Sequence, residues 1–144
     1  MIKVTCDDLK VTVQALNQNG LGLAAMLAKS LNTELLKDSF SITYKRPDKN
    51  LDEATRLKAE GPMTVMRKLQ ELLKPCEGII VSGVIAFDFI NNFEYIGDVP
   101  KGKNPCSDYG FYVFDISIRS NHVHKETTVN AYVFNENSYK ETAF

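Results

Sequence analysis

From Val81 to Tyr112 the chain reads VSGVIAFDFINNFEYIGDVPKGKNPCSDYGFY. Apolar and β-branched residues from Gly78 to Ala86 predict a buried central strand. From Phe87 to Glu94 the apolar residues recur at helical spacing, which predicts a short helix. Gly, Pro, Lys and Asn are frequent from Gly97 to Asp108, which predicts a surface loop before the next apolar run. The stretch therefore predicts the order strand, helix, loop and strand.

The residues at the start of the chain predict a hairpin followed by a helix. Apolar and polar residues alternate over Ile2–Thr5 and Leu9–Leu16, on either side of Asp7-Asp8, as in a β-hairpin. The segment Asn17-Gln18-Asn19-Gly20 predicts a turn with positive φ. Apolar residues at helical spacing then predict an amphipathic helix from Leu21 to Leu31. The hairpin side chains expected to face a core are those of Leu9, Val11, Val13 and Ala15.

The middle of the chain predicts a short strand and a second helix. Phe40 to Tyr44 has the alternation of a strand. The polar segment from Asp48 to Gly61 predicts a loop, with a helical turn from Glu53 to Lys58. A helix is then expected to begin at Pro62, which suits the first helical position, and to end before Pro75. Its apolar side comprises Met63, Met66, Leu69, Leu72 and Leu73.

The end of the chain predicts a second hairpin and completes the fold class. Tyr109–Arg119 and Glu126–Phe134 are expected to pair around a turn from Asn121 to His124. Asn135 or Asn137 is expected to cap a further helix. Strands that come as hairpins, with helices inserted between them, predict an α+β fold with a largely antiparallel or mixed sheet. We expect a single domain over residues 1–144.

Composition excludes several classes of protein. Hydrophobic residues make up 44% of the chain, charged residues 24%, and the net charge is −1, so no electrostatic surface for nucleic acid or an anionic membrane is predicted. No apolar run approaches the ~20 residues that span a bilayer, and no signal peptide is predicted. Cys6, Cys76 and Cys106 are odd in number and widely spaced, which predicts free thiols in a cytoplasmic protein without a disulfide or metal site. His122 and His124 flank the predicted turn, so a Cys–His nucleophile is not predicted.

Asp88 and Glu94 are the carboxylates with the strongest case for a role in chemistry. Asp88 follows a predicted buried strand, and it suits either a general acid in a dry site or the N-cap of the helix. The N-cap is favoured because no second carboxylate or histidine lies nearby in sequence. Glu94 lies near the other end of that helix, where an anion is unfavourable, so it is expected to have a basic partner. Arg67, Lys101 and Lys103 are the candidates for that partner.

The remaining polar and aromatic groups are interpreted as structural. Gly78 and Ser82-Gly83 do not form a GxGxxG or GxxxxGK[ST] loop, and small residues there allow close packing on the strand. Lys45-Arg46 with Lys49 is interpreted as a solvated basic face. Turns and helix ends account for the acidic residues Asp7, Asp8, Asp52, Glu53 and Glu141, whose spacing suits no metal. Core packing accounts for the aromatic residues, with Phe111 on one face of the strand and Tyr112 and Phe114 on the other.

A series of ordered motifs resembles the N-terminal region of the large subunit of anthranilate synthase, a chorismate-utilising enzyme family. The motifs are Val11–Leu16 with Asn19-Gly20, Leu51–Ala54 with Arg56-Leu57, Arg67 with Leu69-Gln70, Ser82-Gly83, Phe87-Asp88-Phe89, Phe93-Glu94, Val99-Pro100, Asn104, Cys106, Asp108, Phe111-Tyr112 and Thr127–Phe134. Aminodeoxychorismate synthase component I shares weaker versions of these motifs. Ser82 departs from a Gly of the family and Phe87 from a Tyr.

This resemblance implies the reaction of a longer enzyme. The family converts chorismate and ammonia, supplied from glutamine by a partner amidotransferase subunit, to anthranilate and pyruvate with Mg²⁺. Its chorismate, Mg²⁺ and acid/base residues lie in a C-terminal domain that no segment here resembles. The motifs of tryptophan feedback inhibition are expected before Met1 and after Phe144. The resemblance therefore assigns no catalytic, cofactor-binding or metal residue to this chain, which is expected to be scaffold of the regulatory N-terminal domain.

A partial domain of this kind is expected to expose apolar surface and unpaired strand edges. Self-association as a symmetric dimer would cover these surfaces. Two other functions remain open at this point. One is a free-standing module that binds a small molecule or regulates a partner, and the other is an independent small enzyme that uses Asp88.

Overall fold

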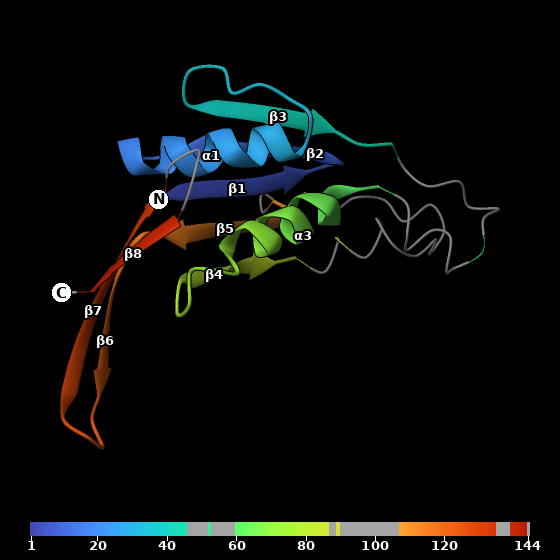
Figure 1. Cartoon of the computed structure of the whole chain (residues 1–144). Coiled ribbons are helices and arrows are strands. Elements are labelled where there is room, and N and C mark those ends of the chain that lie inside the picture. Colours follow the sequence, from blue (N-terminus) through green and yellow to red (C-terminus); the bar gives the residue numbers. More distant parts are fainter. Residues whose placement is uncertain (46–51, 53–59, 87–88, 90–106, 135–138, 144) are drawn as a thin grey trace.

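The computed structural model describes residues 1–45, 52, 60–86, 89, 107–134 and, for the backbone, 139–143. Two helices and eight strands lie in these ranges (Figure 1). Their bounds are β1 Ile2–Asp7, β2 Lys10–Ala15, α1 Gln18–Ser30, β3 Ser39–Thr43, α3 Pro62–Leu73, β4 Ile80–Ile85, β5 Tyr109–Phe114, β6 Ile116–Asn121, β7 Glu126–Phe134 and β8 Tyr139–Ala143. The predicted α+β class and the N-terminal hairpin are confirmed.

A five-stranded antiparallel sheet forms the centre of the fold, in the order β3-β2-β1-β5-β4. The register pairs Val4 with Val13 on one side and with Phe111 on the other, so apolar residues of three strands lie in one row. Alternation in β1 and β2 places Val4 and Val13 inside and Lys10 and Gln14 outside, which confirms the prediction for Val13. Period-2 patterning thus sets both the register and the buried face.

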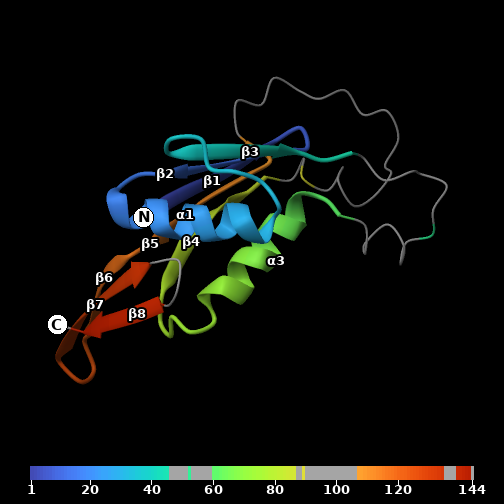
Figure 2. The ribbon, with the colours of Figure 1, turned by 45° about the horizontal axis from the view of Figure 1, so that its top comes forward.

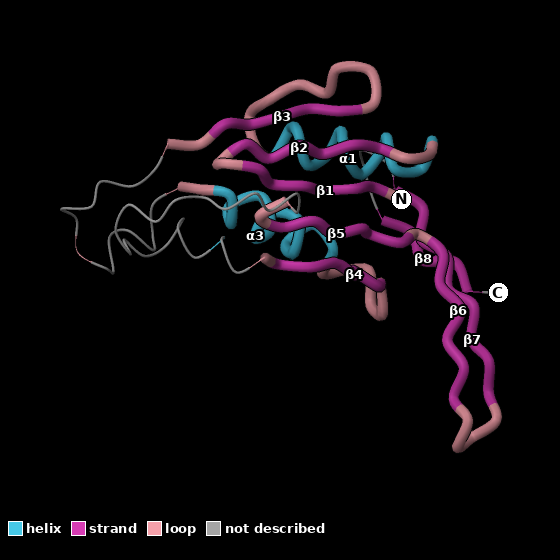
Figure 3. Tube along the Cα trace, turned by 180° about the vertical axis from the view of Figure 1, so that it is seen from behind, coloured by secondary structure: helices cyan, strands magenta, loops and turns pink. Residues whose placement is uncertain are grey.

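Helices α1 and α3 lie side by side on the buried face of this sheet (Figure 2). Leu23 and Leu27 of α1 and Val65 and Leu69 of α3 are almost fully buried between the helices and the sheet. The opposite face is seen in Figure 3, where no described helix or strand covers it. This face is polar at its β3 end and aromatic at its β5 end, where Tyr112 and Phe114 stack with ring centroids 6.0 Å apart.

Each helix begins at a side-chain hydrogen bond. Asn17 caps α1, because its Oδ1 accepts a hydrogen bond from Gly20 N at 2.7 Å. The predicted turn at residues 17–20 is therefore wrong, and the helix begins at Gln18. Helix α3 begins at Pro62, as predicted, and Thr64 Oγ1 accepts a hydrogen bond from Gly61 N at 3.1 Å.

The expected long strand from Tyr109 to Arg119 is two strands in two different sheets. It breaks at Asp115, where β5 leaves the five-stranded sheet and β6 begins a three-stranded sheet with the order β6-β7-β8. Of the hairpin predicted from Tyr109–Arg119 and Glu126–Phe134, the pairing of β6 with β7 is confirmed, and these two strands project away from the large sheet (Figure 1). The helix expected after Asn135 or Asn137 is wrong, because β8 pairs there with β7. The sequence near the end of the chain is polar and does not by itself predict a strand, because β8 forms only by pairing with β7.

Strand β4 lies at an edge of the sheet and not at its centre, so the prediction of a buried central strand is wrong. Val84 is 74% exposed and Ile85 is 61% exposed. Its apolar, β-branched composition is that of a strand covered on both faces, yet the described residues cover neither face completely. Four further predictions lie wholly or largely outside the described residues, namely the helical turn at 53–58, the helix at 87–94 and the loops at 48–61 and 97–108.

A glycine in β4 allows the close approach of β5. A Cβ atom on Gly83 would overlap the carbonyl oxygen of Gly110 and the Cβ of Phe111, the residue opposite it in the register. This confirms the interpretation that a small residue here allows close packing.

We predict that Gly83→Ala lowers the free energy of unfolding by about 1–3 kcal/mol, because the added methyl group overpacks the β4–β5 contact. Gly110→Ala is the matched control, since its Cβ would lie 3.7 Å from Thr5 Cγ2, an ordinary contact. Urea unfolding followed by circular dichroism measures both variants. Equal losses of stability would contradict this account of Gly83.

Candidate functional site

The described acidic residues Asp7, Asp8 and Asp108 form and stabilise the turn between β1 and β2. Asp8 and Leu9 both have positive φ, 47° and 69°, which forms the tight turn between β1 and β2. The backbone N–H of Asp8 donates to Asp108 Oδ2 at 3.1 Å, and Ser107 Oγ donates to Asp7 Oδ2 at 3.3 Å. The interpretation of Asp7-Asp8 as a turn is confirmed, and Asp108 is the residue that fastens this turn to the start of β5.

Several residues with predicted roles lie outside the described part of the chain, so their roles stay predictions. This set comprises Arg46, Lys49, Glu53, Asp88, Glu94, Lys101, Lys103 and Cys106, and the side chain of Glu141. Lys45 and Asp52 are described and are exposed. Among the described residues, no three His, Cys, Asp or Glu side chains are grouped so that they could hold a metal ion.

The two described cysteines and the two histidines lie in different parts of the fold. Cys6 and Cys76 are buried in the core, 0% and 3% exposed. His122 and His124 are exposed at the tip of the β6–β7 hairpin, where Asn121 Oδ1 accepts hydrogen bonds from the backbone of Val123 and His124. The described thiols therefore have no histidine beside them that could activate them as nucleophiles.

The aromatic residues of β5 divide between the two faces, as predicted. Tyr109 and Phe111 are buried on the helix face, while Tyr112 and Phe114 are half-buried on the other face. The Tyr109 hydroxyl donates to the carbonyl oxygen of Pro62 at 2.9 Å and so ties the start of α3 to the sheet. Burial, with smaller contributions from Cys6 and Tyr44, raises the pKa of Tyr109 well above its usual value. It therefore stays neutral and acts as a structural donor.

Asp115 forms a polar junction that the sequence analysis missed. Its Oδ2 accepts hydrogen bonds from Asn17 Nδ2 at 3.0 Å and Asn19 Nδ2 at 2.9 Å, and it lies 3.2 Å from the α-ammonium nitrogen of Met1. Asn19 also bonds the backbone of Tyr132 and Phe134 in β7. One carboxylate thus joins the start of the chain, the cap of α1 and the break between the two sheets.

The charge on Asp115 is stabilised by these partners. Burial alone raises the pKa of a carboxyl group, but the hydrogen bonds from Asn19 and Asn17 and the charge of the α-ammonium outweigh it and lower the pKa of Asp115. A signal for this junction exists in the sequence. Asp115 is the lone charge in the run from Tyr109 to Ile118, at the point where the strand breaks.

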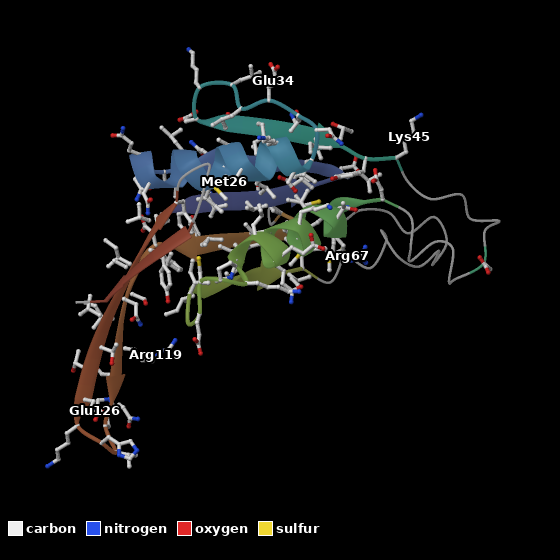
Figure 4. The ribbon with its side chains drawn as sticks, viewed as in Figure 1. Met26, Glu34, Lys45, Arg67, Arg119 and Glu126 are labelled. Carbon is white, nitrogen blue, oxygen red and sulfur yellow. The ribbon has the colours of Figure 1, made fainter. Side chains whose placement is uncertain are left out.

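An apolar groove lies between α3 and the sheet. It has a volume of about 470 Å³ and is lined by Met63, Met66, Leu69, Leu73, Ile79, Val81 and Phe111, with Arg67, Gln70 and Lys74 completing it. Figure 4 shows Arg67 on α3 beside it, while Arg119 extends from β6 toward the turn before β4 and donates to Gly78 O at 3.4 Å. The groove lies where α3 leaves β4 uncovered.

The groove and β4 together form an exposed apolar edge, defined by Val81, Val84 and Ile85 of β4 and the groove residues of α3. A surface of this kind normally contacts another polypeptide segment or a ligand. The expectation of exposed apolar surface and an unpaired strand edge is confirmed for the described residues. A second exposed apolar stripe, Ile116 and Ile118, lies on β6.

Several curated proteins are similar to this chain, and no family model matches it. Anthranilate synthase component 1 of Vibrio cholerae is 26% identical over 141 residues, which are 92% of this chain and 27% of the relative. The Escherichia coli protein of the same name is 28% identical over 146 residues, 94% of this chain and 28% of the relative. The pyocyanine-specific protein of Pseudomonas aeruginosa is 26% identical over 137 residues.

This chain resembles anthranilate synthase component 1. It spans about a quarter of the length of the curated relatives that it matches, and the match lies in their N-terminal portion. Among the motifs that lie in the described residues, several form part of the sheet and its first helix. The segment from Val11 to Gly20 forms β2 and the start of α1, Ser82-Gly83 lies in β4, and Phe111-Tyr112 lies in β5. The described motifs shared with anthranilate synthase component 1 thus carry the fold.

We predict that Asp115→Asn lowers the free energy of unfolding by about 1–3 kcal/mol at pH 7, because a buried charge-assisted junction loses its anion. The folded-state pKa of Asp115 is lowered, so its contribution is present above the usual Asp pKa of about 3.9 and is lost as pH falls below it. The difference between the wild type and the variant should therefore shrink from about pH 5 to pH 2.

Urea titrations at several pH values test this expectation. Asp38→Asn is the matched control, because Asp38 is exposed and its side chain takes no part in the junction. A stability difference that is independent of pH, or the same pH profile for the Asp38 variant, would count against a charged junction at Asp115.

Proposed function

We propose that this chain is the N-terminal scaffold and regulatory part of an anthranilate synthase component 1. The proposed parent enzyme converts chorismate and ammonia to anthranilate and pyruvate in tryptophan biosynthesis. The observation that carries the proposal is the similarity to the relatives, which runs along 92% of this chain but only 27% of the Vibrio cholerae protein. We assign the catalytic, chorismate-binding and Mg²⁺-binding residues to the part of the enzyme beyond this region.

The structure supports the proposal through its surfaces. The exposed apolar edge at β4 and the groove beside it suit a segment of a larger folded body. Asp7 and Asp108 serve the β1–β2 turn and Asp115 forms the junction, and their partners are backbone, hydroxyl, amide and α-ammonium groups. A role in positioning and supporting other elements therefore fits these residues better than a role in chemistry.

Partners and location follow from the same proposal. The relatives are named as component 1, a name that implies a second component. We propose that the second component is a glutamine amidotransferase subunit, that tryptophan regulates the parent enzyme, and that the protein is cytoplasmic. In the described part of the chain, neither helix has the length and apolar character that crossing a membrane requires.

One alternative has a specific observation in its favour. The 470 Å³ groove has the volume of a small-molecule site, which favours a free-standing binding module. Its polar groups come from one helix side and do not converge from several elements, so we rank this function second. Aminodeoxychorismate synthase component I is not favoured, because the relatives described above are named anthranilate synthase.

The genomic DNA on both sides of this coding region tests the proposed function. We expect one uninterrupted reading frame that continues into sequence similar to the remaining three quarters of component 1. Stop codons that isolate these 144 codons would favour the free-standing module. The purified chain with chorismate, Mg²⁺ and an ammonium salt should give no anthranilate fluorescence above a sample without protein. Turnover by the chain alone would overturn the scaffold role.

A further inference from the structure

Asn19 and Gly20 form the only Asn-Gly pair in the 144-residue chain. In such a pair the side-chain amide is readily attacked by the backbone nitrogen of the next residue, because glycine has no Cβ to hinder the approach. The pair lies in the first turn of α1, where Asn19 is half-buried and Gly20 is buried. A Cβ atom on Gly20 would overlap the carbonyl oxygen of Met1, so packing requires the glycine. A chemically labile pair therefore lies at a point where the fold depends on it.

The helix holds the backbone of this pair in an unreactive arrangement. Ring closure joins the Gly20 nitrogen to Cγ of Asn19, and it requires the ψ angle of Asn19 to leave its helical value. The Gly20 N–H is also engaged, because it donates to Asn17 Oδ1 at 2.7 Å in the cap of α1. The first turn of α1 must therefore open before the nitrogen can react.

The side chain of Asn19 is held by three hydrogen bonds to distant strands. Its Nδ2 donates to Asp115 Oδ2 at 2.9 Å and to the carbonyl oxygen of Tyr132 at 2.6 Å. Its Oδ1 accepts a hydrogen bond from Phe134 N at 2.9 Å. The amide can turn toward the Gly20 nitrogen only when these bonds break. Reaction at Asn19 therefore requires the opening of the junction that Asp115 forms with α1.

We propose that Asn19 is a deamidation site whose reaction depends on the opening of the Asp115 junction, and that the reaction prevents the junction from closing again. In the open form, the Gly20 nitrogen bonds to Asn19 Cγ, its proton passes to Nδ2, and the Cγ–Nδ2 bond breaks to release ammonia. Water then opens the resulting succinimide at either carbonyl group and leaves Asp or isoAsp at position 19. The proposal is independent of the function proposed above, because it concerns this one contact.

The product of deamidation lacks the groups that the junction needs. An ionised Asp side chain has no hydrogen to donate, so its oxygens would face two acceptors, Asp115 Oδ2 and the carbonyl oxygen of Tyr132. Its charge would also lie beside the Asp115 anion, and two carboxylates at such a distance repel each other. IsoAsp adds a CH₂ group to the backbone and so disturbs the first turn of α1. Deamidation thus converts a reversible opening into a permanent one.

Peptide mass spectrometry of the full chain, incubated at neutral pH, tests the dependence on opening. Unfolding the wild type in guanidinium chloride should speed the conversion of Asn19 by at least about tenfold, because the unfolded chain has no junction that must open first. Under native conditions Asp115→Asn should react about fivefold faster than the wild type or more, since the junction has lost its anion. Asp38→Asn is the matched control, because Asp38 is exposed and its side chain takes no part in the junction.

Circular dichroism verifies that both variants fold under the native conditions. Equal rates in the native and the unfolded wild type would overturn the proposal, and this comparison needs no variant. The same native rate for Asp115→Asn and Asp38→Asn would also overturn it, because the reaction would then be independent of the junction.

Two substitutions of Asn19 test whether the product prevents closure. Asn19→Asp imitates one product, and Asn19→Ala removes the same donors without adding a charge. An acidic residue in the first turn of a helix is normally stabilising, so a larger loss for Asn19→Asp reports its contact with Asp115. We expect Asn19→Asp to have the lower urea midpoint at about pH 7, and the difference to shrink toward about pH 3 as carboxylates are protonated. Wild-type stability of Asn19→Asp, or equal losses for both variants at every pH, would refute the permanent opening.

Discussion

A single buried carboxylate holds the two sheets and the first helix in their relative positions. Asp115 lies where β5 ends and β6 begins, and it is bonded by the two asparagines of the α1 cap. Asn19 extends this contact to β7 through the backbone of Tyr132 and Phe134. A buried anion is stable only with such partners, so Asp115 must stay beside the asparagines at the start of α1. The β6–β7 hairpin begins directly after Asp115, and its direction therefore depends on where α1 begins.

The exposed surfaces form at the end of the sheet that is farthest from the N-terminal hairpin. Helices α1 and α3 cover the strands as far as β5, and β4 extends beyond them with its apolar residues uncovered. An apolar strand outside the helix layer is unusual in a self-contained domain. Together with the relatives, which are about four times longer, this asymmetry indicates that β4 is suited to a contact with another polypeptide segment.

The parts of the fold that depend on local patterns could be predicted from the sequence. Alternation at Val11 and Val13 identified the buried face of the hairpin, and Pro62 marked the start of α3. Features that depend on distant partners could not. The apolar composition of β4 suits a central strand, and only the order of the strands shows that it lies at an edge. Asn17 was expected in a turn because Asn and Gly residues lie together there. Its role as a helix cap depends on the helix that begins at Gln18. For the site, the sequence indicated a structural role for Ser82-Gly83, but the contacts of Asp115 come from residues about a hundred positions away.

The hydroxyl of Tyr109 gives the protein a built-in optical signal of its folded state. The chain contains six tyrosines and no tryptophan, so its near-ultraviolet absorbance comes largely from phenol rings. Tyr109 is fully buried, and its hydroxyl donates a hydrogen bond to the Pro62 carbonyl oxygen. In alkaline solution exposed phenols ionise while this one remains protonated, and it ionises only when the contact between α3 and the sheet opens. The phenolate absorbance that appears last in an alkaline titration is therefore expected to include a signal from the opening of that contact, without an added chromophore.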